Sequence, residues 1–398
     1  SKEHGCNRDA PREIAGSRGR QERFWEMSGE AGDIPGLDPA IDRAPPPRAR
    51  WGRRSPGRAN GRFGNDRGGA TYAALDLGTN NCRLLVARPS GEGFRVVDAF
   101  SRIVRLGEGV SSSRRLSEAA ISRAVAALAI CRNKMKNKGV TRARLIATEA
   151  CRTAENGAEF LDRVSDELGL ELEVIDRETE ACLAATGCTP LIDPHAAGVV
   201  LFDIGGGSSE LVRLERSQHS RCGPPLPQIR GWISVPHGVV TLAERYGGIT
   251  VTRECYDAMV VEVADLIAPF VREHGGDEAE GIHMLGTSGT VTTIAGVHLN
   301  LKRYDRNRVD GCWMSAEEIN AVVERLLTMS YEDRVASPCI GAERADLVLA
   351  GCAILEAIRR AFPCPRLRVA DRGLREGMLV QMMREDGAWG GNSQAAPS

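Results

Sequence analysis

The chain has 398 residues, of which 42% are apolar and 5% aromatic, and its formal net charge at pH 7 is -1. This length and apolar fraction suffice for two or three domains with aliphatic cores. The balanced charge argues against a nucleic-acid or membrane partner, and no apolar run approaches the eighteen residues typical of a membrane-spanning helix.

The chain contains twelve scattered cysteines. None forms a C-x-x-C pair, and none is spaced from a histidine in the manner of a zinc ligand. In a chain of this length they are typical of reduced, mostly buried thiols. The Arg-, Gly- and Pro-rich N-terminus lacks the apolar segment of a secretory signal, so we expect a cytoplasmic protein.

Residues 1–70 carry little apolar periodicity, and arginines are frequent between Arg43 and Arg67. This composition cannot bury enough surface to offset the entropy of ordering, so we expect a disordered basic arm. It is either an inert leader or a tether for an anionic polymer.

Strands and helices are predicted to alternate after this arm. In the first half, strands are expected from Tyr72 and at 82–87, 94–100, 144–147 and 172–176, with helices at 117–137, 160–168 and 178–186. The second half has predicted strands at 198–202, 210–214, 233–235, 282–285 and 366–369, with helices at 239–245, 253–273 and from 374, and a polar hairpin tip at 217–231.

Both halves contain a strand, an Asp-x-Gly turn, a second strand and later helices, which indicates an internal duplication. We therefore expect an α/β fold with one lobe at 71–183 and another at 184–385, facing each other across a cleft. Residues 386–398 are expected to form a loose tail.

The first motif is Asp76-Leu-Gly-Thr-Asn80-Asn81, at the end of the first predicted strand. An Asp there, followed by Gly and a hydroxyl residue, can direct a carboxylate and backbone N–H groups at a phosphate and its metal ion. The same spacing is also typical of an ordinary hairpin turn, so both interpretations stay open for this motif alone.

The second motif runs from Asp203 through Ile and three glycines to Ser208, Ser209 and Glu210. Three successive glycines after a buried strand cost conformational entropy, and they suit a place where backbone amides approach a ligand closely. The flanking carboxylates can hold a hard cation, because magnesium favours carboxylate oxygens together with substrate phosphate. A plain turn is the weaker interpretation here.

The third motif, Gly286-Thr-Ser-Gly-Thr290, follows a strand and opens a helix. A helix N-terminus with small hydroxyl residues binds anions readily. A simple helix cap explains the same residues, and this alternative stays open for the motif taken alone.

Two further charged side chains lie near predicted element ends. Arg152, in the segment Ala147-Thr-Glu-Ala-Cys-Arg152, can clamp a phosphate with two hydrogen bonds, although an ion pair is the commoner fate of an arginine. Glu180 lies at the start of a predicted helix, where a lone glutamate is usually a solvated charge.

Taken in order, these segments resemble the exopolyphosphatase/guanosine pentaphosphate phosphatase (Ppx/GppA) family over roughly residues 72–383. The resemblance rests on Asp-Leu-Gly-Thr-Asn, Ala-Thr-Glu-Ala-x-Arg-x-Ala-x-Asn, Glu-Ala, Asp-Ile-Gly-Gly-Gly-Ser-Ser-Glu, Gly-Thr-Ser-Gly-Thr and Asp371-Arg-Gly-Leu-Arg-Glu-Gly, in the family's order and spacing. It implies two actin-like, ribonuclease H-like lobes of the acetate and sugar kinase, Hsp70 and actin superfamily. It also implies magnesium-dependent removal of a terminal phosphate, and homodimers, which are frequent in the family.

The resemblance assigns roles by position. Glu180 matches the catalytic carboxylate that activates water, and Asp76, Asp203 and Glu210 match the metal-site carboxylates. The implied contacts to substrate phosphate are Asn80, Arg152, Gly205, Gly206, Gly207, Ser208, Ser209, Gly286, Ser288, Gly289 and Thr290. Such a set suits phosphoanhydride hydrolysis, which needs a positioned water and neutralised charge rather than covalent chemistry.

The sequence departs from the family at Thr179, Cys182 and Asn81, where Glu, Arg and Ser are common. These changes bear on phosphate-binding detail and leave the implied catalytic set intact. We also expect a short form without the family's C-terminal helical extension, which weighs against processive digestion of long polyphosphate.

An exopolyphosphatase is the leading hypothesis, and hydrolysis of guanosine pentaphosphate is the close alternative, since both need the same cleft. A small-molecule kinase of the same superfold fits the glycine turns, but Arg152 and Glu180 fit a hydrolase better. A non-catalytic sensor of polyphosphate or alarmone is disfavoured because Glu180, Asp203 and Glu210 are all present.

Overall fold

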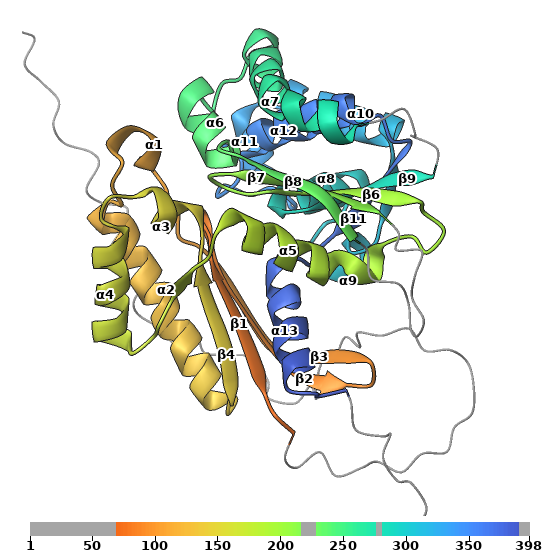
Figure 1. Cartoon of the computed structure of the whole chain (residues 1–398). Helices are drawn as coiled ribbons and strands as arrows, with labels where there is room; N and C mark the ends of the chain where they lie inside the picture. Colours follow the sequence, from red (N-terminus) through yellow and green to blue (C-terminus); the bar gives the residue numbers. More distant parts are fainter. Residues whose placement is uncertain (1–68, 216–227, 276–280, 390–398) are drawn as a thin grey trace, which may run out of the picture. The chain divides into compact units, whose positions relative to one another are not determined.

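The computed structural model describes residues 69–215, 228–275 and 281–389, which contain two mixed sheets with helices (Figure 1). The expected basic arm lies outside the described residues except for its last two positions. Most of the predicted hairpin tip and most of the predicted tail also lie outside them.

The first sheet has the strand order β3-β2-β1-β4-β5. Its central strand β1 is antiparallel to β2 and parallel to β4, and nearly all of its side chains are buried, as the apolar run from Tyr72 predicts. The strands are β1 (Tyr72–Leu77), β2 (Asn81–Ser90), β3 (Gly93–Ile103), β4 (Arg142–Ala147) and β5 (Glu173–Val174).

The second sheet has the order β10-β11-β9-β6-β7-β8. Within it, β8-β7-β6-β9-β11 repeats the order and the strand directions of the first sheet, so the predicted duplication and the expected fold of two actin-like lobes are confirmed. The strands are β6 (Gly198–Ile204), β7 (Ser209–Glu215), β8 (Gln228–Val235), β9 (Ile282–Thr287), β10 (Trp313–Ser315) and β11 (Arg366–Ala370).

The first lobe's helices include α2, which fills the range 117–137 predicted to be helical except for Ser117, its N-cap. The Ser117 hydroxyl accepts a hydrogen bond from the backbone N–H of Ala120, and the helix buries Ile121 and Leu128 against the first sheet. The helices of this half are α1 (Val110–Ser113), α2 (Glu118–Asn137), α3 (Glu149–Thr153), α4 (Gly157–Leu168) and α5 (Arg177–Cys188).

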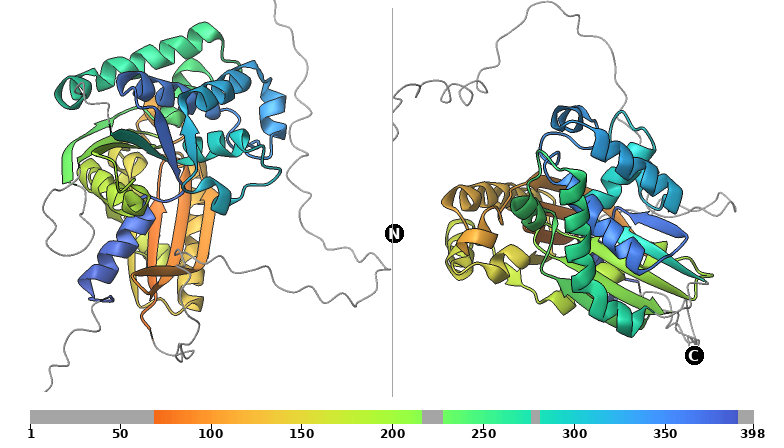
Figure 2. Two further views of the ribbon diagram at one scale, coloured as in Figure 1. Left: turned by 90° about the vertical axis from the view of Figure 1, so that its right-hand side faces the viewer. Right: turned by 90° about the horizontal axis from the view of Figure 1, so that it is seen from above.

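The second sheet is covered on both faces. Helices α7 and α12 lie on one face and α5 on the other (Figures 1 and 2). After α5 comes a short 3-10 turn (Thr189–Leu191), and the remaining helices are α6 (Val239–Tyr246), α7 (Arg253–His274), α8 (Gly289–His298), α9 (Arg306–Val309), α10 (Ala316–Thr328), α11 (Tyr331–Ala336) and α12 (Val348–Ala361). No helix within the described ranges combines the length and apolar character that a membrane crossing requires.

The last helix, α13 (Leu374–Glu385), packs on the first sheet although the expected boundaries place it in the second lobe (Figure 1). Its face with Met378 and Leu379 contacts Tyr72 and Leu85 in one core cluster. It crosses α5 closely, because a Cβ at Gly377 would lie 2.0 Å from the carbonyl oxygen of Leu183.

The first residues of the predicted loose tail are docked on the same sheet. The Tyr72 hydroxyl donates to Asp386, and the Trp389 indole N–H donates to the carbonyl of Gly93. The prediction of a loose tail is therefore wrong for residues 386–389, because an aromatic side chain and a carboxylate find partners on the first sheet.

Candidate active site

The turns after β1, β6 and β9 open into one cleft of about 990 Å³. Among the carboxyl groups that line it, four come from separate elements: Asp76 from β1, Glu180 from α5, Asp203 from β6 and Glu210 from β7. The fold thus gathers the predicted catalytic and metal-site carboxylates into one place. The other predicted site residues that line the cleft are Asn80, Gly205, Gly206, Gly207, Ser208, Ser288, Gly289 and Thr290.

Two of the predicted phosphate contacts serve packing instead of lining the cleft. Ser209 is fully buried, and its hydroxyl donates to the carbonyl oxygen of His237 at 2.8 Å. Gly286 leaves room for Phe202, since a Cβ there would lie 2.5 Å from the ring. Both residues therefore contact protein groups in this structure.

The two lobes place different charges at equivalent positions of their first hairpins. In the first lobe Asp76 stands opposite Arg83, and in the second lobe Asp203 stands opposite Glu210. Both partners follow their Asp by seven residues, so Arg83 is the counterpart of Glu210. The duplicated hairpin therefore contributes a cation to the cleft from one lobe and a second carboxylate from the other.

The carboxyl groups are difficult to ionise together. Burial, followed by the charge of Glu210, raises the pKa of Glu180 to about 8, against the opposing effect of Arg152. Burial together with neighbouring carboxylates raises the pKa of Asp203 to about 7 and that of Glu210 to about 7. Burial also raises the pKa of Asp76. A cation that compensates their charge would favour the ionised forms of these groups.

The chemistry of the donors fits a magnesium ion that keeps water ligands. Within the described residues, no three Asp, Glu, His or Cys side chains converge as a complete metal-binding group. The buried side-chain oxygens of Asn80 and Asn81 have no hydrogen-bond partner in the described part of the chain. Unpaired amide oxygens beside carboxylates suit magnesium, which usually takes one or two carboxylates plus waters and substrate phosphate.

The glycines of the second motif let the two lobes' turns meet. A Cβ at Gly207 would lie 2.8 Å from the hydroxyl oxygen of Thr79, and one at Gly206 would lie 3.0 Å from Thr79 Cβ. The backbone N–H groups of Val239 and Val240, at the start of α6, donate to the carbonyls of Gly205 and Gly206. The lack of side chains at Gly206 and Gly207 therefore allows the loops of the two lobes to contact each other, in addition to the predicted approach to a ligand.

Ser288 caps helix α8 and lines the cleft at the same time. Its hydroxyl oxygen accepts hydrogen bonds from the N–H groups of Thr290 and Val291, as the helix-cap interpretation of this motif predicts. Its φ of 142° lies in a region that non-glycine residues rarely adopt. The turn is thus held in a strained conformation directly beside the cleft.

Arg152 does not line the cleft in this structure. Its Nη1 donates to the carbonyl oxygen of Ile175 at 2.7 Å, and its Nη2 donates to Glu149 Oε2 at 2.8 Å and to Glu180 Oε2 at 2.9 Å. The predicted phosphate clamp is therefore occupied here by protein acceptors, two of them carboxylates. Segment 149–153, which lies outside the predicted helices, forms the short helix α3 that carries this arginine.

Several arginines that were not predicted as site residues line the cleft. Arg83, Arg344 and Arg375 form no ion pair with a carboxylate of the described residues. Burial lowers the pKa of Arg344 and of Arg375, and the nearby charge of Arg83 lowers both further. Like charges held together in this way provide a binding surface for a polyanion. Arg102, Arg306 and Arg372 also line the cleft.

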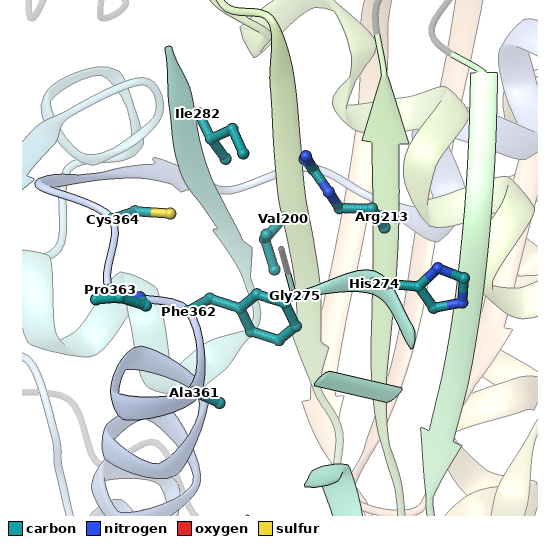
Figure 3. A pocket seen from close by; sticks show the side chains of 9 residues that line it. All are labelled: Val200, Arg213, His274, Gly275, Ile282, Ala361, Phe362, Pro363 and Cys364. Atoms are coloured by element: carbon teal, nitrogen blue, oxygen red, sulfur yellow. The ribbon is translucent and has the colours of Figure 1, made fainter. Parts of the chain in front are cut away.

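A second cavity, of about 30 Å³, lies beside β6 and the end of α12 (Figure 3). Figure 3 shows the side chains of Val200, Ile282 and Phe362 lining it, with Arg213 and His274 on its other side. A cavity of this size holds about one water molecule, so it is no candidate for a substrate site.

Comparisons with known proteins agree with this geometry. A protein from Haemophilus influenzae named putative exopolyphosphatase is 26% identical over 317 residues, which cover 78% of this chain and 90% of that protein. A protein from Photobacterium profundum named guanosine-5'-triphosphate,3'-diphosphate pyrophosphatase is 28% identical over 328 residues. That match covers 78% of this chain but only 59% of the relative.

The solved structure of an exopolyphosphatase-like protein is 30% identical and superposes with a TM-score of 0.70, covering 79% of this chain and 98% of the other. The model of the Ppx/GppA phosphatase family matches residues 85–386, which include every cleft carboxylate except Asp76. Since this match spans most of the chain and the same lobes and cleft are present, the chain belongs to the Ppx/GppA phosphatase family.

Proposed function

We propose that this protein is an exopolyphosphatase that hydrolyses the terminal phosphate of inorganic polyphosphate. The observation that carries the proposal is that carboxyl groups and arginines line one cleft together. Carboxyl groups gather around Glu180 and Asp203, while Arg83, Arg344 and Arg375 line the same cavity. A carboxylate beside an arginine-lined cavity suits a substrate that is a chain of phosphates, of which only the end is cut.

In this proposal Glu180 accepts the proton of the attacking water as the general base. Its raised pKa supports the role, because a base with a pKa near the working pH is strong enough to take a proton and still ionised often enough to act. Asp76, Asp203 and Glu210 do not converge as a group of three, so one or two of these carboxylates would hold a magnesium ion that keeps water ligands. Such an ion neutralises negative charge on phosphoryl oxygens when bound. The backbone turn at Gly205–Ser208 and the N-terminus of α8 flank the position of the terminal phosphate.

In this proposal Arg83, Arg344 and Arg375 hold the leaving group, which is the rest of the polyphosphate chain. Burial lowers the pKa of Arg344 and that of Arg375, because it disfavours their charged forms. A bound phosphate would raise both pKa values again, since its negative charge compensates the buried positive charges. Planar guanidinium groups also bind phosphate oxygens with two parallel hydrogen bonds. The remaining polyphosphate chain is thereby oriented in line with the attacking water.

Hydrolysis of guanosine pentaphosphate is the second candidate. Two observations favour it: the Photobacterium profundum relative carries a guanosine name at similar identity, and the Tyr304 ring is 39% exposed in the cleft wall. The Tyr304 hydroxyl donates to Asp371 Oδ2 at 2.8 Å, which fixes the ring near Arg306. A fixed, exposed aromatic ring suits stacking with a nucleobase.

Phosphate release in the presence of magnesium tests these proposals, with polyphosphates of several defined lengths, guanosine pentaphosphate and ATP as substrates. We expect polyphosphate to be the best substrate. Glu180→Gln should lose two to four orders of magnitude in kcat, roughly the contribution of a general base. Glu178→Gln is the matched control, because Glu178 is exposed on the same helical turn and should leave the rate unchanged.

Preference for guanosine pentaphosphate in this assay would establish the second candidate. Binding of polyphosphate or guanosine pentaphosphate without release of phosphate from any substrate would contradict both hydrolase proposals. That result would indicate a non-catalytic sensor.

A further inference from the structure

The carboxylate of Glu149 is buried beside the proposed base and accepts four hydrogen bonds. Its Oε2 receives Nε and Nη2 of Arg152 at 3.1 and 2.8 Å. Its Oε1 receives Nη2 of Arg177 at 2.8 Å and the hydroxyl of Thr153 at 3.0 Å. Because both oxygens are saturated and the residue is only 8% exposed, the Glu149 side chain has a defined position.

Arg152 connects this carboxylate to Glu180. Its Nη2 donates to Glu149 and to Glu180, and its Nη1 is held by the carbonyl of Ile175. The Glu180 carboxylate forms no other hydrogen bond or ion pair with the described residues, so Arg152 is the contact that orients it. The orientation of Arg152 depends in turn on the two hydrogen bonds that it donates to Glu149.

The burial of this chain of charges separates it from an ordinary surface ion pair. The side chains of Glu149, Arg152 and Glu180 are 11%, 15% and 14% exposed. An exposed pair of this kind contributes little, whereas buried charges with several hydrogen bonds hold a fixed geometry. With Arg177, the four side chains alternate in sign, and their formal charges cancel.

We propose that Glu149 is a positioning residue for the hydrolytic reaction: it fixes the guanidinium of Arg152, which fixes the carboxylate of Glu180. This inference rests on the proposed function of Glu180 as the base. A general base must lie within hydrogen-bond reach of its water in the correct orientation, and small displacements reduce the rate strongly. Without Glu149, Arg152 keeps only its hydrogen bond to the carbonyl of Ile175 and no longer holds Glu180 toward the water.

The test is a double-mutant cycle on steady-state hydrolysis of the best substrate. Glu149→Gln should lower kcat about 10- to 100-fold and leave KM within twofold, because both oxygens of Glu149, although it lines the cleft, are already taken up by hydrogen bonds from protein groups. Arg152→Ala should produce a similar loss. If Glu149 acts through Arg152, the double variant loses no more than Arg152→Ala alone.

Controls separate positioning from general damage to the fold. Glu155→Gln removes an exposed carboxylate just after α3, the helix that carries Glu149, so kcat should stay unchanged. Glu149→Asp keeps the charge and should recover part of the lost kcat. An unchanged kcat in Glu149→Gln, or losses that multiply in the double variant, would overturn the inference.

A crystal structure of Glu149→Gln provides a readout that does not depend on activity. We expect the Arg152 guanidinium to leave Glu180 Oε2, from which it is 2.9 Å away in the native chain. An unmoved Arg152 would contradict the inference even if the wild-type protein hydrolyses nothing. An inactive wild-type protein would instead contradict the proposed function, so the two failures are distinguishable.

Discussion

Arg105 of the first lobe and Asp346 of the second form a two-pronged ion pair, in which Nη1 donates to Oδ2 at 2.9 Å and Nη2 donates to Oδ1 at 3.0 Å. A second link lies nearby, where the backbone N–H of Gly109 and the hydroxyl of Ser111 donate to Glu244. The segment between β3 and α2 therefore ties one side of the cleft to the other. These contacts favour the closed arrangement in which both lobes line one cavity.

We predict that Arg105→Ala favours opening of the cleft. The two side chains of the pair are 30% and 24% exposed, so its loss should cost about 1 kcal/mol after screening, or about fivefold in the closed-to-open ratio. Arg105→Lys should have an intermediate effect, because lysine cannot form the two-pronged pair. The measurements are KM for polyphosphate and the radius of gyration from small-angle X-ray scattering.

The control for this variant is Arg114→Ala, since Arg114 pairs with Glu155 within one lobe and both side chains are exposed. Its KM should match that of the wild type. If Arg105→Ala also shows wild-type KM and radius of gyration, the pair does not help to hold the cleft closed.

The dependence of activity on pH should respond to magnesium. Glu180 acts as a base only when it is ionised, and its pKa is raised to about 8 by burial and by the charge of Glu210. At limiting magnesium, kcat/KM should therefore rise with pH through this region. A cation at the neighbouring carboxylates favours the ionised form, so added magnesium should move the rise to lower pH. If the pH at which kcat/KM rises is the same with and without added magnesium, this prediction is wrong.

The metal-free protein should lose stability as pH rises toward 8. Asp203 and Glu210 have folded pKa values raised to about 7, well above the values of about 4 expected in the unfolded chain. Groups shifted in this direction stabilise the fold at pH below the unfolded value, and their contribution is lost as pH rises through the folded value. The melting temperature in a chelator should therefore fall between pH 6 and 8.

Magnesium should restore the melting temperature at pH 8, and Asp203→Asn should flatten its dependence on pH because one repelling charge is gone. Asp257→Asn, at an exposed position of α7, should behave like the wild type. A melting temperature that rises with pH over this range without metal would show that the carboxylates are not mutually repelling.

The crossing of α5 and α13 should tolerate no added side chain. A Cβ at Gly377 would meet the backbone carbonyl of Leu183, and one at Gly187 would meet the carbonyl of Gly373, each at 2.0 Å. Because backbone atoms cannot turn aside as a flexible side chain can, Gly377→Ala should destabilise the protein by about 1–3 kcal/mol. Urea denaturation measures this change, and Gly93→Ala, with open space around it, is the control. Equal midpoints would refute the close crossing.

Local patterns account for the part of this fold that the sequence predicts. The strands from Tyr72 and at 198–202 are short apolar runs that end in Asp-x-Gly turns, and the N-cap at Ser117 depends only on its own helix. Asp76, Asp203 and Glu210 could be placed because they belong to Asp-x-Gly motifs, whereas Glu180 was assigned only through the family resemblance. Arg83 could have been found in the same way, by aligning its hairpin with the one that carries Glu210.

Other features depend on contacts between distant segments. Arg344 has no local motif, and only the second lobe's packing brings it beside Arg83. The partners of Arg152 could not be chosen from sequence, because a guanidinium suits phosphate and carboxylate equally. The arginines of Asp371-Arg-Gly-Leu-Arg-Glu-Gly were visible as part of a motif, but their place in the cleft follows from the return of α13 to the first sheet.

That return has a consequence for synthesis on the ribosome. Residues Tyr72 and Leu85 emerge before the second lobe, but the helix that covers their face of the sheet is made after that lobe. The first lobe to be translated is therefore the last to be completed, and its apolar face stays exposed while the whole second lobe is synthesised. Nascent chains stalled before residue 374 should thus be bound by chaperones at the first lobe, even when the second lobe has already folded.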